Sequence, residues 1–353
     1  MAQQRAGGTE WDVIVVGAGI IGCAVAREVA CRGAKTMILE GRDVGAGATQ
    51  ASAGVLAPYI EAPSDGPLHA LAVQSLALYD DFIKNVADES GQSIEYRRCG
   101  TLELAHDGHA AEQLKTLGDW IRSKGVEAQW VDAPGVTKIE PALNATSGGL
   151  LVPSHGYVRA VQLTDALLAA ARRRGADVRI GPHVESITED GDCALVASGT
   201  DIYRARTVVV AAGSWSSELA GETHVAPVRG QLVRVRWQGP PLQRILWSES
   251  CYLVPWLDGT LLVGATVEQV GFDERVTAGG VQTLLNAASA VLPGIGDATF
   301  VEARVGLRPS TPSGLPIIGR SAQHAAVVYA TGHFRNGILL APLTATLVAD
   351  LIL

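Results

Sequence analysis

The stretch Trp11–Arg42, WDVIVVGAGIIGCAVAREVACRGAKTMILEGR, constrains the fold more than any other part of the chain. Its apolar run Val13–Val16 suits a strand that is covered on both faces. Apolar residues then recur at helical spacing, at Ile21, Val25 and Val29. Gly33 marks the end of this helix, and TMILE predicts a second strand that ends at Glu40. The sequence therefore predicts a β-α-β unit.

Three glycines between the first strand and the helix, Gly17, Gly19 and Gly22, form a G-x-G-x-x-G motif. Without side chains they allow the backbone and the helix N-terminus to approach a pyrophosphate closely. Glu40, 18 residues after Gly22, can accept two hydrogen bonds from a ribose diol and would repel a 2′-phosphate. The unit predicts binding of NAD or FAD; the alternatives are a glycine turn that serves packing alone and a solvated acid.

A long loop of small residues, GRDVGAGATQASAGVLAP at 41–58, follows where nicotinamide enzymes usually add further βα units. Such a loop can lie against a flat ring system. The sheet pattern returns only with a helix at about 162–174, a strand after Gly175 and a buried strand at 207–211. This late return indicates an insertion, and the β-rich stretches 93–147 and 223–301 fit a separate substrate domain.

Composition excludes several classes of protein. Apolar residues make up 47% of the 353 residues and charged residues 18%, which is enough for a large core and argues against disorder. The net charge is −8 and the longest basic run is Arg172–Arg174, so no nucleic-acid partner is expected. The start MAQQRAGGTE is polar and no apolar run approaches the ~20 residues of a membrane span. We therefore expect a cytoplasmic protein.

The five cysteines are scattered and form no CxxC pair: Cys23, Cys31, Cys99, Cys193 and Cys251. This pattern argues against a disulfide framework and against a structural zinc site. We expect reduced, mostly buried thiols and no metal.

The end of the chain, YATGHFRNGILLAPLTATLVADLIL, predicts an apolar strand, a turn that contains His333 and Arg335, and a helix. A cation and the positive end of a helix would then face the same point in space. The simpler alternative is an ordinary polar turn before a terminal helix.

Six motifs occur in the order found in one known family: VIVVGAGIIGCAVAREVACRGAKTMILEG, ATQASAGVLAP, TVVVAAGSWS, CYLVPWLDGTLLVGAT, VGLRPSTPSGLPIIGR and GHFRNGILLAP. By these motifs the chain resembles the D-amino-acid oxidase/glycine oxidase family of flavoproteins, and most of all the bacterial glycine oxidases of thiamine biosynthesis. The resemblance covers nearly the whole chain after residue 10. It implies an α/β fold: a Rossmann-like FAD-binding domain (10–92, 148–222 and 302–353) with an inserted antiparallel β-sheet substrate domain (93–147 and 223–301).

The implied cofactor is noncovalent FAD, because no histidine in the early loop and no cysteine near the C-terminal motif stands where covalently flavinylated relatives attach the ring. The resemblance implies FAD contacts from Gly17, Gly19, Ile20, Ile21, Gly22, Glu40, Gly41, Arg42, Ala48, Thr49, Gln50, Ser52, Ala53, Gly54, Val55, Val184, Ala212, Gly213, Trp215, His333, Phe334, Arg335, Asn336, Gly337 and Ile338. The amides of the turn at 335–338 would stabilise the negative charge that develops near N1 and the C2 carbonyl when the flavin accepts a hydride.

The implied reaction is oxidative deamination of glycine or a small amine acid such as sarcosine or a small D-amino acid. Hydride would pass from Cα to flavin N5, the imine would hydrolyse, and oxygen would become hydrogen peroxide. The glycine imine could supply thiamine thiazole synthesis. No dedicated acid or base is required, and His333 is expected to be a turn residue rather than a base.

A substrate carboxylate needs a cationic partner, and Arg229, Arg304, Arg308 and Arg335 all qualify by sequence alone. The resemblance selects Arg308 as the anchor, with the Tyr252 hydroxyl as a second donor and Arg335 at the entrance. The expected catalytic residues are therefore Arg308, Tyr252 and Arg335.

The expected substrate pocket adds Val267 to these three residues. Val267 stands where relatives carry methionine, Ser250 replaces a histidine, and Trp256 replaces a common arginine. We therefore expect the volume and polarity of the pocket to differ from those of the relatives, which leaves room for a bulkier secondary amine.

Two other functions stay open from sequence. One is a dehydrogenase of a secondary amine or 2-hydroxy acid that passes electrons to a quinone or carrier protein. The other is a dinucleotide-binding module without turnover. Assembly into a homo-oligomer is left open as well.

Overall fold

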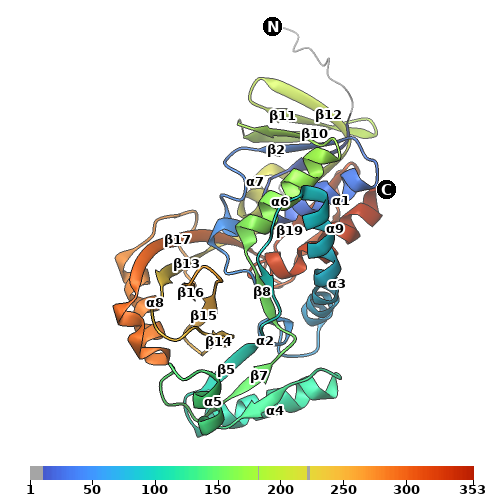
Figure 1. Ribbon diagram of the computed structural model, residues 1–353. Helices are drawn as coiled ribbons and strands as arrows, with labels where there is room; N and C mark the ends of the chain where they lie inside the picture. Colours follow the sequence, from blue (N-terminus) through green and yellow to red (C-terminus); the bar gives the residue numbers. More distant parts are fainter. Residues whose placement is uncertain (1–10, 182, 221–222) are drawn as a thin grey trace.

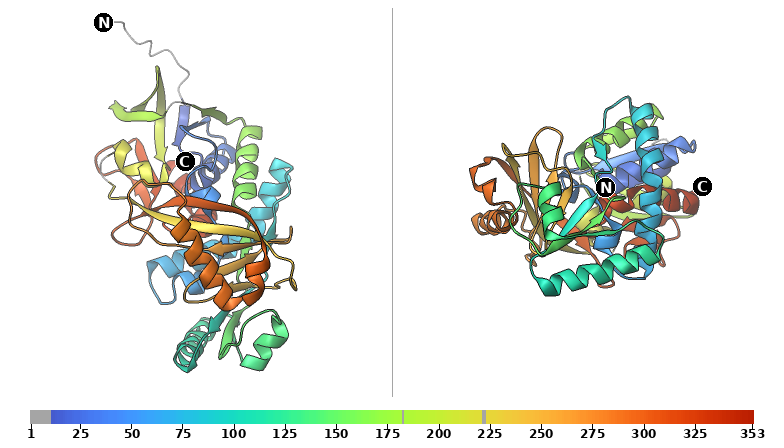
Figure 2. Two further views of the ribbon diagram at one scale, coloured as in Figure 1. Left: turned by 90° about the vertical axis from the view of Figure 1, so that its left-hand side faces the viewer. Right: turned by 60° about the horizontal axis from the view of Figure 1, so that its bottom comes forward.

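The computed structural model describes residues 11–181, 183–220 and 223–353. Two large sheets lie at opposite ends of the molecule, and a cluster of helices packs beside one of them (Figures 1 and 2). No helix in these ranges combines the length and the apolar character needed to cross a bilayer. The five cysteines are free, as the sequence predicts.

The first sheet has eight strands and contains the predicted β-α-β unit. Its parallel strands are β9 (Asp177–Ile180), β2 (Thr36–Glu40), β1 (Trp11–Val16), β12 (Asp201–Val210) and β19 (Val327–Thr331). Antiparallel strands complete it: β10 (Val184–Asp190), β11 (Cys193–Ser198) and β18 (Ile317–Arg320). Ile14 in β1 pairs with Val208 and Met37 on its two sides, and all three side chains are buried.

Four helices cover one face of this sheet and pack against one another (Figure 1): α1 (Ile20–Cys31), α3 (Pro67–Ser90), α6 (Ala160–Arg173) and α9 (Gly337–Ile352). Apolar residues of β1 and of these helices form one core cluster. The opposite face of β1 and β2 packs against apolar residues of β11 and β12. Coverage on both faces explains why the central strands are continuous apolar runs.

The second sheet also has eight strands. Their order is β17 (Thr299–Ser310), β13 (Ala226–Arg236), β16 (Thr260–Gly264), β15 (Tyr252–Pro255), β14 (Ile245–Trp247), β5 (Thr101–Ala105), β7 (Gly148–Val152) and β6 (Gln129–Val131). All neighbouring pairs are antiparallel except the parallel pair β14–β5. Helices α8 (Ala278–Val291), α4 (Gly108–Ser123) and α5 (Ala133–Ile139) pack against this sheet.

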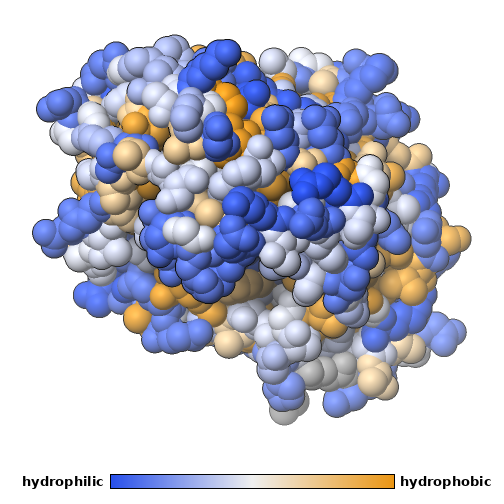
Figure 3. All heavy atoms as spheres, turned by 90° about the horizontal axis from the view of Figure 1, so that it is seen from below, coloured by the Kyte–Doolittle hydropathy of each residue, from blue (hydrophilic) through white to orange (hydrophobic). Residues whose placement is uncertain are grey.

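The short elements complete the chain. A three-stranded sheet consists of β3 (Val55–Leu56), β8 (Gly156–Val158) and β4 (Tyr96–Arg97). The remaining helices are α2 (Pro58–Glu61), α7 (Ser216–Ala220) and the 3-10 turns η1 (Ala48–Ala51), η2 (Gly213–Trp215) and η3 (Pro293–Asp297). Seen from below, the surface is mainly polar, with apolar residues in small scattered groups (Figure 3).

The predicted domain boundaries cut across the second sheet at two places. They put residues 148–152 and 302–310 in the FAD-binding domain, but β7 and β17 pair within the second sheet. Local sequence does not reveal this pairing because it is non-local: β7 pairs with β5, from Ala105 with Gly148 to Thr101 with Val152. The division into two domains stays a prediction.

One buried histidine joins the second sheet to the short elements. His155 follows β7, and its Nδ1 lies 2.7 Å from the Thr101 hydroxyl in β5. Its ring stacks on Tyr59 of α2, with ring centroids 5.7 Å apart. Burial lowers the pKa of His155 to about 3, so the ring is neutral in the native protein.

We expect this histidine to weaken the fold in acid. Below the ordinary histidine pKa of ~6.5, His155 is protonated in the unfolded chain but stays neutral in the native protein. The free energy of unfolding therefore falls as pH drops from about 6.5 toward 3. At pH 5 the loss is about 2 kcal/mol relative to pH 7. Melting temperatures measured from pH 7 to pH 4.5 should fall less steeply in H155Q than in the wild type. The exposed His106 provides the control: H106Q should keep the wild-type slope, and an equal slope in H155Q would contradict the expectation.

Candidate functional site

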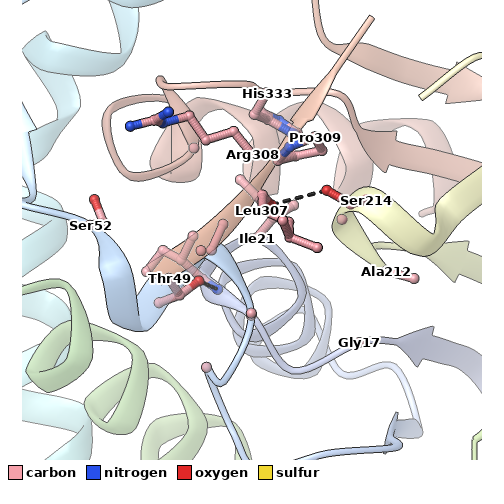
Figure 4. Close-up of a pocket in the computed structure, with 18 of the residues that line it drawn as sticks. Gly17, Ile21, Thr49, Ser52, Ala212, Ser214, Leu307, Arg308, Pro309 and His333 are labelled. Carbon is pink, nitrogen blue, oxygen red and sulfur yellow. Dashed lines mark hydrogen bonds between the residues drawn. The ribbon is translucent and has the colours of Figure 1, made fainter. Parts of the chain in front are cut away.

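A cavity of about 820 Å³ runs from the carboxyl ends of the parallel strands in the first sheet to the second sheet. In Figure 4, Gly17 and the guanidinium of Arg308 lie at opposite ends of the labelled residues. The ends of β1, β2, β12 and β19 contribute Val16, Leu39, Ala211 and Ala330 to its wall. This is the edge at which open α/β sheets bind their ligands.

The glycine motif forms a tight turn at one end of the cavity. Gly17 has φ +105°, and a Cβ there would lie 2.5 Å from the Ala211 carbonyl oxygen. A Cβ on Gly22 would lie 1.9 Å from the Gly17 oxygen, so α1 can start here only with glycine at both positions. Gly17 and Gly19 line the cavity, whereas Gly22 supports the turn from behind.

Glu40 fixes this turn from the end of β2. Its Oε2 accepts a hydrogen bond from Ala18 N at 2.6 Å, and its Oε1 accepts one from Arg42 N at 2.8 Å. Each carboxylate oxygen keeps capacity for a further hydrogen bond. Glu40 therefore holds the backbone of the glycine turn while its carboxylate lines the cavity.

Most of the predicted FAD contacts line this one cavity. They are Gly17, Gly19, Ile20, Ile21, Glu40, Gly41, Arg42, Ala48, Thr49, Ser52, Ala53, Gly54, Val55, Val184, Ala212, Gly213, Trp215, His333, Phe334, Arg335, Gly337 and Ile338. Gly22, Gln50 and Asn336 do not line it. Gln50 points to β17 instead: its Nε2 donates to the Val305 oxygen at 2.7 Å, so it anchors η1 on the second sheet.

The C-terminal turn brings the start of α9 to the cavity. Phe334 has φ +49°, a left-handed conformation that is uncommon outside glycine, and its N–H donates to Pro309 O at 2.8 Å. Asn336 caps α9 without a side-chain hydrogen bond, and the first helical residues Gly337 and Ile338 line the cavity. The positive end of the helix thus faces this space.

A proline and a tyrosine shape the same helix start. Pro342 has no N–H, so it cannot bond the Ile338 carbonyl one turn earlier. The hydroxyl of the buried Tyr79 donates to that carbonyl instead. Burial raises the pKa of Tyr79 well above its ordinary value, so the hydroxyl keeps its proton as a donor. The carbonyl that the proline leaves without a helical partner is therefore bonded.

His333 packs against α9 and contacts one of its side chains. The residue is buried, and its Nε2 lies 3.0 Å from the hydroxyl of Thr344 in α9. Burial lowers its pKa to about 3, which keeps the ring neutral.

Arg308 projects into the cavity from β17 (Figure 4). Its Nη1 donates to Thr266 O at 2.9 Å and contacts Arg229 O at 3.4 Å. Gly230 makes room for the guanidinium, because a Cβ there would lie 2.2 Å from Nη2. Among the described residues Nη2 and Nε have no hydrogen-bond partner, which leaves one edge of the fork for a ligand.

The other candidate arginines differ in their availability. Arg229 is buried and ion-paired with Glu268 and Asp273, and Arg304 bonds Gln50 O and Glu302. Neither lines the cavity. Arg335 does line it, at a more exposed position.

Tyr252 lies beside Arg308 in the cavity wall. Its ring stacks on Trp247 with centroids 5.0 Å apart, and a Cβ on Gly264 would lie 2.3 Å from the tyrosine ring. Burial raises the pKa of Tyr252, and the nearby Arg308 and Arg335 oppose this shift. The hydroxyl is therefore a neutral hydrogen-bond donor.

Val267 is not a pocket residue. It is 58% exposed and does not line the cavity. The neighbouring side chains of Thr266 and Glu268 turn inward, where Thr266 Oγ1 donates to Glu268 Oε1 at 2.6 Å. In an extended segment the intervening side chain must then point outward. The expectation from the methionine of relatives is wrong for this position.

Glu61 and Trp247 are among the cavity residues that sequence reasoning missed. Glu61 ends α2, and its Oε1 lies 3.1 Å from Nη2 of Arg335. Trp247 lies under the same guanidinium, with the Arg335 Cζ 5.9 Å from its ring centroid. The only sequence signal was a lone acid in the apolar segment VLAPYIEAP, which could equally mark a surface turn.

Comparison with known proteins agrees with this architecture. The family model described as FAD dependent oxidoreductase (DAO) matches residues 12–351. The glycine oxidase of Geobacillus kaustophilus is 36% identical over 349 residues, which is 97% of this chain and 93% of that protein. The crystal structure of a glycine oxidase from Geobacillus kaustophilus superimposes with a TM-score of 0.94, covering 98% of this chain and 95% of that one.

Two further relatives show how the fold is used elsewhere. The bifunctional protein ThiO/ThiG of a Nostoc species is 36% identical over 97% of this chain, which spans only 52% of that longer protein. The iminodiacetate oxidase IdaA from Chelativorans sp. BNC1 has a TM-score of 0.89 at 27% identity, covering 96% of this chain and 95% of that one.

The cavity between the two sheets thus lies in a fold shared by these enzymes, and the chain belongs to the DAO family of FAD-dependent oxidoreductases.

Proposed function

We propose that this protein uses noncovalently bound FAD to oxidise glycine or another small amine acid. The observation that carries the proposal is the position of Arg308 and Tyr252 in the same cavity as the start of α9. The relatives named glycine oxidase support the choice of substrate class. Oxygen is the proposed final acceptor, with hydrogen peroxide as its product.

The residues that line the cavity fit FAD. The glycine turn at Gly17 leaves no room for a Cβ beside Ala211 and so suits a pyrophosphate pressed against backbone. Glu40 would bind the ribose, and η1 with the start of α9 would hold the isoalloxazine ring. When bound, FAD supplies the acceptor for the hydride that leaves the substrate Cα.

The protein's own groups bind and orient the substrate. The free edge of the Arg308 guanidinium would pair with the substrate carboxylate, and the Tyr252 hydroxyl would donate a second hydrogen bond. The stacked rings of Trp247 and Tyr252 form an aromatic part of the cavity wall. His333 is bonded to Thr344, and burial lowers its pKa to about 3, so it is too weak a base to take a proton from the substrate. We propose that the substrate amine reacts in its neutral form.

The product is an imine, which water hydrolyses to an oxo acid and ammonia, or to an oxo acid and methylamine where sarcosine is the substrate. The likeness to bifunctional ThiO/ThiG proteins supports a role in which glycine imine feeds thiazole formation in thiamine synthesis.

A panel of amine acids tests the proposal directly. Glycine, sarcosine, D-alanine and D-proline are added anaerobically to the yellow holoenzyme, and at least one should bleach the flavin. Admission of air should restore the colour and release peroxide, and acid precipitation of the protein should free the FAD. Bleaching without peroxide would indicate a dehydrogenase, and a protein that no amine acid bleaches would contradict the proposal.

Arg308 should dominate substrate binding. Its removal leaves the substrate carboxylate without a partner in a partly buried site, so R308A should lose on the order of 10² to 10⁴-fold in kcat/KM for the preferred amine acid. R308K should recover only part of this, because a lysine lacks the fork. R236A, on the exposed end of β13, is the matched control and should behave like the wild type. Near-wild-type activity in R308A would remove Arg308 from the site.

The start of α9 should raise the reduction potential of the bound flavin. A Cβ on Gly337 would meet only ordinary contacts, at 3.8 Å from His333 and 3.9 Å from Ile20. G337D adds a negative charge at the helix end and should therefore lower the two-electron reduction potential of the bound flavin. G337N, of the same shape but neutral, should stay near the wild type. Equal potentials in the two variants, measured at matched FAD content, would contradict this role of the helix end.

A further inference from the structure

We propose that Glu61 makes the pocket selective for amine acids with a single carboxylate. Glu61 forms an ion pair with Arg335, which leaves the guanidinium of Arg308 as the one available to the substrate. The inference rests on the proposed function and adds the residue that sets its substrate class. Without Glu61 the cavity would offer two cations, which is the arrangement that a dicarboxylate requires.

The contacts of the three charged groups support this assignment. Glu61 Oε1 lies 3.1 Å from Arg335 Nη2, and the two side chains are 13% and 33% exposed. Both line the cavity together with Arg308. Burial raises the pKa of the Glu61 carboxyl, and the charges of Arg335 and Arg308 oppose that shift. Both guanidinium groups therefore attract the Glu61 carboxylate, and Arg335 is also hydrogen-bonded to it.

The charge balance then distinguishes the two classes of substrate. Two guanidinium groups and one carboxylate give this part of the pocket a net charge of +1, and the carboxylate of glycine brings this to zero. A second substrate carboxylate would be an unpaired charge in a partly buried site, close to Glu61, and would be repelled.

Both members of the ion pair are held in place independently of each other. Tyr59, two residues before Glu61, is fixed between His155 and Trp120, with ring centroids at 5.7 and 6.1 Å. Arg335 follows Phe334, whose amide is bonded to Pro309, and its guanidinium lies over Trp247. Loss of the charge on Glu61 should therefore leave Arg335 in the cavity and available to an anion.

The fold is compatible with the alternative substrate class. The protein similar to this chain that is named an iminodiacetate oxidase acts, by that name, on an amine with two carboxylates. One charge could thus separate the two specificities within a common architecture.

The test compares the wild type, E61Q, E61Q/R335Q and E89Q as FAD-loaded proteins. Glutamine keeps the shape of Glu61 and can still accept from Arg335, but it carries no charge. Glu89 is the matched control, because it is ion-paired with Arg27 between α1 and α3 and does not line the cavity.

Two readouts are used. Dissociation constants for acetate and malonate come from the change in flavin absorbance on binding, which needs no turnover. Anaerobic flavin reduction by glycine and by iminodiacetate gives the ratio of their rate constants.

In E61Q the malonate-to-acetate affinity ratio should rise by about tenfold or more, since an interaction with a charged partner is gained. The iminodiacetate-to-glycine ratio should rise in parallel. Both gains should disappear in E61Q/R335Q, and E89Q should match the wild type.

Unchanged ratios in E61Q, or gains that persist in E61Q/R335Q, would overturn the inference. Its failure is separable from that of the proposed function. If glycine bleaches the wild type and the ratios stay constant, only the role of Glu61 is wrong. If no amine acid bleaches any variant but malonate binding responds as expected, the proposed reaction is wrong and the anion selectivity stands.

Discussion

The C-terminal end of β17 is the connection on which the geometry of the site depends. This strand is hydrogen-bonded along β13 in the second sheet, yet its last residues contact the loops of the first. Leu307 O accepts from the Ser214 hydroxyl at 3.0 Å, and Pro309 O accepts from Phe334 N at 2.8 Å. Arg308 lies between these two anchors. The residue proposed to hold the substrate is thereby fixed to both halves of the cavity and to the turn that starts α9.

Strand, turn and helix patterns in the first sheet could be predicted because they are local. Buried parallel strands are apolar runs, glycine appears where a Cβ would collide with backbone, and Glu40 ends β2 where its carboxylate can bond the glycine turn. The resemblance to a family added Arg308, Tyr252 and the terminal turn, all of which the structure brings to one cavity. These are positions where a backbone requirement or a motif restricts the residue.

The features that could not be predicted depend on contacts between distant segments. Val267 faces outward because Thr266 and Glu268 are drawn inward by the buried Arg229 network, which nothing near Val267 in the sequence reveals. Gln50 turns to β17 and away from the cavity for the same kind of reason. Glu61 comes next to Arg335, 274 residues later in the chain, only after two segments of the fold have packed. A single sequence carries no local signal for such pairs.

Titratable and charged side chains of the cavity have defined charge states and defined partners. The cation at Arg308 is held by neutral carbonyls of Thr266 and Arg229, which orient it without cancelling its charge. The cation at Arg335 is held by the carboxylate of Glu61, which does cancel it. His333 and Tyr252 stay neutral because burial disfavours their charged forms. Of Arg308, Arg335, His333 and Tyr252, Arg308 is thus the side chain whose charge is oriented but not neutralised, and this is the charge that the proposed monoanionic substrate would pair with.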